Sequence, residues 1–241
     1  VSALSLVGTD ASTTLRTSAM TVASFFWSIL MCNVPLSIPS DHAGQCGILN
    51  DGSSGEGSSI MQERSHAFAM KSQFWLMDPR PNLPSIVKTV KMGFELSEAS
   101  NTPVMLMVRI RSCHVTGRFT CHDNVRPTLT VRDALAQPQR DFSRVVLPPM
   151  SYIHEHDKIN NRWPAAEKFI LNHQLNEQFG PHVSKIGIIC QGGMYNGLIR
   201  ALQRLGLADI YGETQVPIYC LNVTYPLVNT EFLSFVEGKD G

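Results

Sequence analysis

The sequence has six cysteines, but no two of them stand in a C-x-x-C pair. This absence argues against a zinc ribbon or a cluster-binding run within the chain, and free thiols fit a reduced, cytoplasmic setting. An excess of charge is also missing, since 20 basic residues balance 20 acidic ones. Because there is no excess of basic residues to attract nucleic acid, we expect no nucleic-acid partner. Any selectivity for a ligand must then come from local groups.

Long apolar runs are missing as well. Residues 17–40 carry no charge, but serine, asparagine and proline interrupt them, so the apolar runs fall short of the roughly 20 residues that a membrane span requires. We expect a buried helix or an irregular packed segment there, and no membrane helix or signal peptide. A membrane-attached protein that uses residues 19–36 stays open as an alternative interpretation. The sequence also contains no G-x-S-x-G, H-E-x-x-H or kinase motif.

An alternation of strands and helices is what the sequence does contain. A strand is predicted over residues 74–77, and Asn82 and Pro84 are typical of the start of a helix. Residues 104–108 are apolar without alternation, as in a parallel strand that is covered on both faces. These segments predict a β-α-β crossover and an α/β protein.

A second α/β unit is predicted nearer the C-terminus. Prolines across residues 119–149 indicate the exit from the first unit, and residues 162–179 predict a connecting helix. Strands are expected at 186–190 and 218–223, with a helix between them. The turn Gln191-Gly192-Gly193 could hold an anion or could allow tight backbone packing.

A loop of small residues precedes a predicted helix over residues 60–71. Its residues Gly55, Gly57, Ser58 and Ser59 would let the backbone approach a carboxylate or phosphate. The spacing matches neither the dinucleotide fingerprint nor the P-loop, so an ordinary turn is the alternative. Farther along, Gln62 and His66 are four residues apart and share one helix face, where His66 is a candidate proton carrier.

Cationic side chains follow the apolar strand at 104–108. Alternation places Arg109 and Arg111 on the same side, and His114 comes shortly after. Buried arginines need a partner, which could be a ligand, another subunit or a carboxylate of the chain itself. The pairs Cys113-His114 and Cys121-His122 lack the usual zinc spacing, so no metal site is predicted.

Longer runs of sequence resemble the thiamine-diphosphate-dependent 2-oxoacid:ferredoxin oxidoreductases, in particular the indolepyruvate ferredoxin oxidoreductases with large or fused chains. The resembling runs span most of residues 47–240 and are residues 55–72, 78–84, 94–104, 109–117, 147–149, 162–166, 191–196 and 222–227. The resemblance implies a partial pyrimidine-binding-type domain with an open parallel sheet (1–120) and a linker with a connecting helix (121–181). The start of a transketolase-C-terminal-like α/β domain (182–241) would follow.

In that family an aryl 2-oxoacid such as indolepyruvate is oxidatively decarboxylated to acyl-CoA, and electrons pass through [4Fe-4S] clusters to ferredoxin. By position, the resemblance implies that Gly55, Gly57, Ser58, Ser59 and Gln62 face thiamine diphosphate. It implies a substrate-binding role for His66, Arg109, Arg111 and His114.

The chain also departs from the family pattern. The cofactor-activating glutamate would lie upstream of Val1, and the diphosphate–magnesium motif and the cluster cysteines are not in this sequence. We therefore expect a piece of a longer polypeptide, inactive alone, whose thiamine and magnesium site another domain or subunit completes in a homodimer or larger assembly. Residues 12–46 do not match the family. A noncatalytic α/β interaction or regulatory module derived from the family is the alternative function.

Overall fold

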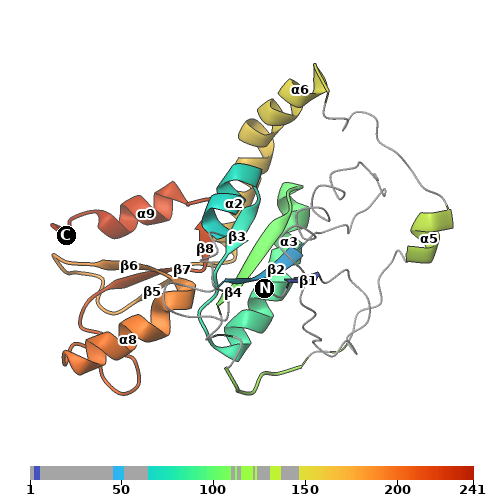
Figure 1. Ribbon diagram of the computed structural model, residues 1–241. Helices are drawn as coiled ribbons and strands as arrows, with labels where there is room; N and C mark the ends of the chain where they lie inside the picture. Colours follow the sequence, from blue (N-terminus) through green and yellow to red (C-terminus); the bar gives the residue numbers. More distant parts are fainter. Residues whose placement is uncertain are drawn as a thin grey trace.

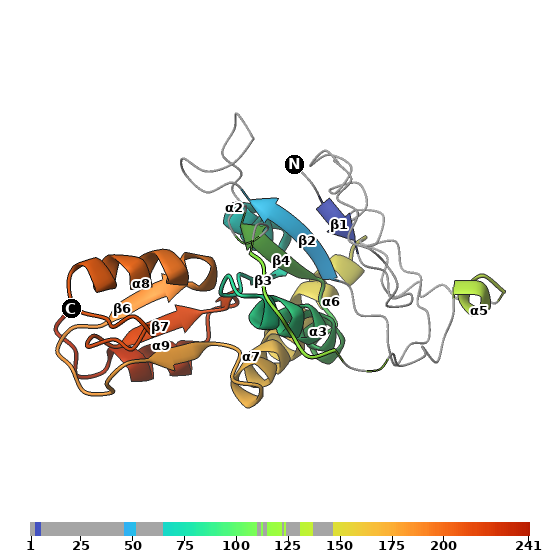
Figure 2. The same cartoon turned by 90° about the horizontal axis from the view of Figure 1, so that it is seen from below.

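The computed structural model describes residues 3–5, 46–51, 65–109, 112, 115–121, 123, 131–136 and 147–241. These residues form two α/β lobes around separate sheets (Figure 1). The elements of the first lobe are β1 (Ala3–Ser5), β2 (Cys46–Asp51), α2 (Ser65–Ser72), β3 (Trp75–Met77), α3 (Leu83–Ser100), β4 (Val104–Arg109), α6 (Met150–Asp157), the π-helical turn η2 (Lys158–Arg162), α7 (Trp163–Asn172) and β8 (Val223–Tyr225). The second lobe contains β5 (Glu177–Phe179), β6 (Ile188–Gln191), the 3₁₀ turn η3 (Gly192–Met194), α8 (Tyr195–Arg204), β7 (Ile218–Leu221) and α9 (Asn229–Val236). Helix α5 (Val131–Ala136) lies away from both sheets in Figures 1 and 2.

The first sheet confirms the predicted α/β class and the predicted crossover. Its strand order is β1-β2-β4-β3-β8, and β4 pairs in parallel with both β2 and β3. The outer strands β1 and β8 are antiparallel to their neighbours. The sheet is therefore mixed, which corrects the prediction of a parallel sheet. The correction arises because β8 comes from the C-terminal part of the chain, where no crossover helix leads into this sheet.

Helices cover both faces of the first sheet. Trp75 and Leu106 are buried on the face that packs against α3 and α7, while Leu76 and Met105 are buried on the opposite face with Ala69 of α2. Side chains alternate between the faces of a strand, so both faces must be covered for such continuous apolar runs. Each of these large side chains contributes about 1.5–3 kcal/mol by leaving water.

The N-terminal cap of α3 confirms the helix start that the sequence predicts. The Oδ1 atom of Asn82 accepts a hydrogen bond from the Ser85 N–H at 2.9 Å, and Pro84 lies in the first turn. At the other end Asn101 adopts a left-handed conformation with φ 46°. A left-handed residue ends a helix because the following peptide can no longer continue the ladder.

The predicted connecting helix over residues 162–179 is too long. Helix α7 ends at Asn172, and residues 177–179 form the strand β5 instead. Gln174 has φ 47°, which breaks the helix. Leu175 and Asn176 are buried beyond that break, so the chain turns inward to reach the second sheet.

The second sheet has the strand order β5-β7-β6, with β6 and β7 parallel. Ile218 and Cys220 pack with Ile199 of α8 on one face. Tyr219 points to the other face, where its ring lies 5.4 Å from that of Phe235 in α9. Helices α8 and α9 therefore cover opposite faces of a three-layered lobe, as Figures 1 and 2 show.

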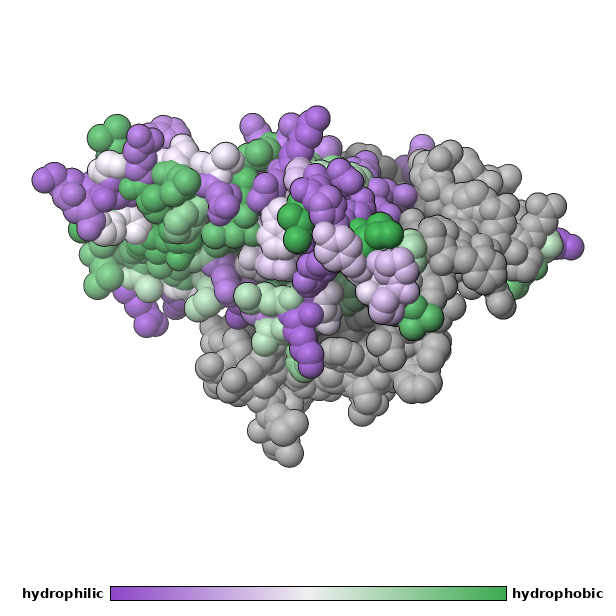
Figure 3. Space-filling view, turned by 90° about the horizontal axis from the view of Figure 1, so that it is seen from above, coloured by the Kyte–Doolittle hydropathy of each residue, from purple (hydrophilic) through white to green (hydrophobic). Residues whose placement is uncertain are grey.

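No helix among the described residues is long and apolar enough to cross a membrane. Residues 19–36, which carry the membrane alternative, lie outside the described residues. Some apolar side chains are exposed, and Figure 3 shows apolar surface over the second lobe. In that lobe Ile186 is 60% exposed and Leu233 is 62% exposed.

Lys158 lies in η2 and is buried within the first lobe. Its Nζ atom donates a hydrogen bond to the Gln73 carbonyl oxygen at 2.6 Å and lies 5.5 Å from the centre of the Trp75 ring. Burial disfavours the ammonium form, and the nearby Arg162 adds repulsion, so the pKa of Lys158 falls from 10.5 to about 8.

Replacing Lys158 with Met should flatten the pH dependence of stability in alkaline solution. Between pH 8 and 10.5 the unfolded chain keeps the Lys158 proton while the folded chain has released it, so the free energy of unfolding rises with pH. We expect a rise of about 1–2 kcal/mol in the wild type after allowing for solvent screening. Urea unfolding at pH 7.5 and pH 10 measures it. An equal rise in the Lys158→Met variant would contradict this assignment.

Candidate functional site

The two lobes meet at Asn222, the single residue between β7 and β8. The chain crosses here from the second sheet to the first. The Asp78 N–H donates to the Asn222 carbonyl oxygen at 2.8 Å, and the Arg80 N–H donates to the Asn222 Oδ1 atom at 3.1 Å. Asp78 and Arg80 directly follow strand β3, so the end of that strand is hydrogen-bonded to the crossing point.

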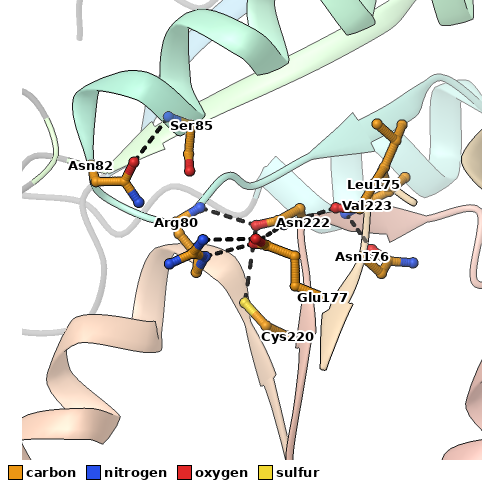
Figure 4. A network of polar contacts seen from close by, with 9 residues as sticks. All are labelled: Arg80, Asn82, Ser85, Leu175, Asn176, Glu177, Cys220, Asn222 and Val223. Atoms are coloured by element: carbon orange, nitrogen blue, oxygen red, sulfur yellow. Dashed lines mark hydrogen bonds and ion pairs between the residues drawn. The ribbon is translucent and has the colours of Figure 1, made fainter. Parts of the chain in front are cut away.

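An ion pair between Arg80 and Glu177 also links the two lobes beside Asn222 (Figure 4). The Arg80 guanidinium donates to both carboxylate oxygens of Glu177, at 2.6 and 2.7 Å. The Asn222 Nδ2 atom donates to Glu177 Oε2 at 2.8 Å. The same guanidinium lies 4.9 Å from the ring centre of Phe179 and 5.0 Å from that of Tyr195. Arg80 thereby holds a strand and a helix of the second lobe to the end of β3.

These contacts fix the charge state of Glu177. Burial works against its carboxylate form, but the hydrogen bonds from Arg80 and Asn222 outweigh burial and hold the pKa of Glu177 below its ordinary value. Glu177 is therefore an ionised structural partner at neutral pH, and Arg80 is not free to bind an external anion.

A second arginine pairs with Asp78 at the ends of β3, β4 and β6. The Arg109 Nη2 atom donates to Asp78 Oδ2 at 2.9 Å and to Gln191 Oε1 at 2.6 Å. Asp78 is fully buried, so burial raises its pKa, while the hydrogen bond from Arg109 and the charge of that guanidinium oppose the rise. The sequence left three possible partners open for Arg109: a ligand, another subunit or a carboxylate of the chain itself. The structure shows the third, the carboxylate of Asp78.

The hydrogen bonds of Gln191 define the protonation of His66. Arg109 can only donate, so the side-chain oxygen of Gln191 faces Arg109 and its NH₂ group faces His66. The Nε2 atoms of Gln191 and His66 lie 3.1 Å apart. His66 Nε2 must therefore accept this hydrogen bond, which places the imidazole proton on Nδ1.

In the variant Gln191→Glu, the His66 Nε2 atom that faces residue 191 should become protonated and act as the hydrogen-bond donor. A carboxylate offers only acceptors, so His66 would have to carry a proton on Nε2 to keep the contact. The ¹⁵N chemical shifts of the imidazole nitrogens report the protonated atom directly. We expect Nδ1–H in the wild type and protonated Nε2 in the variant, with the exposed His182 unchanged as the control. A wild-type His66 already protonated on Nε2 would refute the assignment.

The turn Gly192–Gly193 packs directly against these groups. A side chain at Gly192 would collide with the Asp78 carbonyl oxygen and lie 2.7 Å from Asn222 Oδ1. At Gly193 a side chain would collide with Asp78 Oδ1 and Arg109 Nε. Of the two predicted roles for these glycines, the structure confirms tight backbone packing.

The structure brings together two of the predicted site residues, His66 and Arg109, which Gln191 joins. The other predicted residues lie outside the described residues: Gly55, Gly57, Ser58, Ser59, Gln62, Arg111 and His114. Their assigned roles remain predictions, and the binding roles of His66 and Arg109 also remain predictions.

We call Asp78, Arg80, Arg109, Glu177, Gln191 and Asn222 the polar joint. Sequence patterns indicated Arg109 and the turn that begins at Gln191, but not the other four members or the contacts among the six. The sequence does indicate part of the polar joint. Asp78-Pro79-Arg80-Pro81 follows a predicted strand, and its two prolines end the strand pairing there, so that two charged residues lie at the strand end. Glu177 and Asn222 carry no local signal.

The described residues do not fit a diphosphate group. The Arg80 and Arg109 guanidiniums are paired with Glu177 and Asp78, and the glycine turn is filled by the chain's own atoms. No group of three metal-ligating side chains occurs in the part of the chain that the structure describes. A diphosphate–magnesium site, if this protein uses one, must be built from other residues.

The fold and the joint define a two-lobed α/β protein whose strand ends converge on a buried polar contact. The chain is 29% identical over 193 residues to the indolepyruvate oxidoreductase subunit IorA of Methanothermobacter marburgensis, covering 75% of this chain and 28% of that protein. It is 27% identical over 161 residues to the subunit of the same name from Methanothermobacter thermautotrophicus, covering 62% and 23%. These matches confirm the resemblance to indolepyruvate oxidoreductases.

The chain spans about a quarter of the length of these curated relatives. No family model matches the chain, and no solved structure matches it.

Proposed function

We propose that the chain is part of an enzyme that oxidatively decarboxylates an aryl 2-oxoacid such as indolepyruvate. The similarity to two indolepyruvate oxidoreductase subunits, which extends over three quarters of this chain in one case, carries the proposal. Thiamine diphosphate would supply the carbanion stabilisation when bound, coenzyme A would take the acyl group, and ferredoxin would accept the electrons.

In this proposal the described residues form the frame of the site. The joint holds the carboxyl ends of β3, β4 and β6 together through Asp78, Arg109 and Gln191, and ligands of α/β sheets bind beside such ends. The contact with Gln191 places the His66 imidazole beside this frame. His66 would orient the 2-oxoacid, with Arg111 and His114 as the further substrate contacts.

The domains and partners follow from the same proposal. Residues 1–120 would form a pyrimidine-binding-type domain, residues 121–181 a linker with a connecting helix, and residues 182–241 the start of a transketolase-C-terminal-like domain. Gly55, Gly57, Ser58, Ser59 and Gln62 would line one wall of the thiamine pocket. Another domain or subunit would bring the magnesium site and the [4Fe-4S] clusters, in a cytoplasmic homodimer or larger assembly.

Two observations favour a second candidate, a noncatalytic module derived from the same family. Both arginines of the joint are neutralised by the chain's own carboxylates, and the turn Gly192–Gly193 is packed rather than open. Such a module would keep the fold and use its surface for an interaction.

Steady-state kinetics of the assembled oxidoreductase separate these candidates. Reduction of ferredoxin with indolepyruvate, coenzyme A and thiamine diphosphate is measured for the wild type, His66→Ala, Arg111→Ala and the control His182→Ala. We expect KM for the 2-oxoacid to rise about tenfold or more in the first two variants, since one lost charge-assisted hydrogen bond is worth about 1.5–3 kcal/mol. The isolated chain should not turn over.

The absence of turnover by the wild-type assembly with any aryl 2-oxoacid would refute the proposed activity. Turnover with normal KM in both site variants would make their roles structural and leave the catalytic site elsewhere.

A further inference from the structure

Cys190 and Cys220 occupy in-register positions on the parallel strands β6 and β7. In-register side chains of neighbouring strands project to the same face, and their Cα atoms lie about 4.8 Å apart. This separation falls within the range of about 4.4–6.8 Å that disulfides span. The sheet therefore presents two thiols in a position to be linked.

The two thiols differ in access and acidity. β6 is an edge strand and Cys190 is partly exposed, whereas Cys220 lies on the central strand and is fully buried. Interaction with Cys220 lowers the pKa of Cys190, while interaction with Cys190 and burial raise the pKa of Cys220. Thiolate character and exposure together select Cys190 as the group that reacts first, with Cys220 beside it.

The pair also adjoins the polar joint. Cys190 directly precedes Gln191, and the Cys220 Sγ atom lies 4.0 Å from Asn222 Oδ1. The Asp78 carboxylate acts on Cys190 from the first lobe and opposes its ionisation. A covalent change at these thiols would therefore occur next to the residues that hold the lobes together.

We propose that Cys190 and Cys220 form a thiol modification site that a hydroperoxide converts into a reversible disulfide. The Cys190 thiolate attacks one peroxide oxygen, so that an S–O bond forms, the O–O bond breaks, and hydroxide leaves and takes a proton to become water. Cys220 then attacks the sulfenic sulfur, the S–O bond breaks, and a second water leaves. Two thiols are oxidised by two electrons in total, and one hydrogen peroxide is reduced to two waters.

Peptide mapping of the full chain tests this directly. Trypsin releases residues 186–200 and 205–239, each of which contains one cysteine, Cys190 or Cys220. After treatment with one equivalent of hydrogen peroxide and alkylation of free thiols, we expect most of the two peptides to be recovered as one disulfide-linked species. Dithiothreitol should return them to separate alkylated peptides.

Two variants test the order of the steps. Cys220→Ser should stop the reaction at a sulfenic acid on Cys190, which a 1,3-dione reagent labels, and Cys190→Ser should abolish linkage without labelling Cys220. The exposed Cys121 shows that peroxide was effective. Recovery of separately alkylated 186–200 and 205–239 peptides from wild type in which Cys121 is oxidised would overturn the proposal, whatever the fate of the variants.

Discussion

Gly192→Ala should lower the free energy of unfolding by about 3 kcal/mol, within the cost of forcing extra atoms into a well-packed interior. The new methyl group would collide with the Asp78 carbonyl oxygen and press on Asn222 Oδ1 and the Arg80 N–H at 2.7 and 2.9 Å. These atoms are backbone or are held by several hydrogen bonds, so they cannot move aside individually. Urea unfolding monitored by tryptophan fluorescence measures the change.

The matched control is Gly197→Ala, five residues farther along in α8. A side chain at Gly197 would meet no atom within 4 Å, and alanine favours a helix interior over glycine by about 0.5–1 kcal/mol. We expect Gly197→Ala to be neutral or slightly stabilising. If Gly192→Ala were equally harmless, the turn would not be packed against the end of β3.

Arg109→Met should destabilise the chain by about 3–5 kcal/mol, because removing one partner of a buried ion pair leaves the other charge uncompensated. Asp78 is fully buried, and Arg109 donates to both Asp78 and Gln191. The methionine side chain preserves much of the buried volume, so the loss measures mainly the electrostatic contact. Chemical unfolding at pH 7 provides the value.

The double variant Asp78→Asn with Arg109→Met separates lost pairing from lost packing. Without a buried carboxylate, the methionine leaves no uncompensated charge, and we expect the double variant to recover more than half of the stability that Arg109→Met loses. Strictly additive losses in the double-mutant cycle would show that the Asp78–Arg109 pair is not coupled.

Local patterns predicted β3, α3 and β4 of the first lobe because the causes of these elements are local. Asn82 caps α3 through the Ser85 N–H, three residues away. The apolar run of β4 is buried, and its composition indicates burial without knowledge of which strands lie beside it. The Gly192–Gly193 turn was ambiguous, because the same two glycines suit an anion or a close backbone contact. Only the position of Asp78 decides between them.

The joint could not be predicted residue by residue, because its partners are far apart in the sequence. Arg80 bonds Glu177 across 97 positions and Asn222 across 142. The passage from β7 to β8 also escaped prediction, since one strand of residues 218–223 looked continuous. Asn222 divides that segment between two sheets, and its side chain accepts from the Arg80 N–H and donates to the Leu175 carbonyl oxygen.

Native-state hydrogen exchange tests most directly whether the joint makes the two lobes one cooperative unit. The amides of Leu106 in β4 and of Tyr219 in β7 lie in different sheets. We predict that their opening free energies converge on one value, that of global unfolding, as urea is raised. In Gly192→Ala the value for Tyr219 should fall below that for Leu106. Two separate values in the wild type, with the second sheet opening while the first stays closed, would contradict the account.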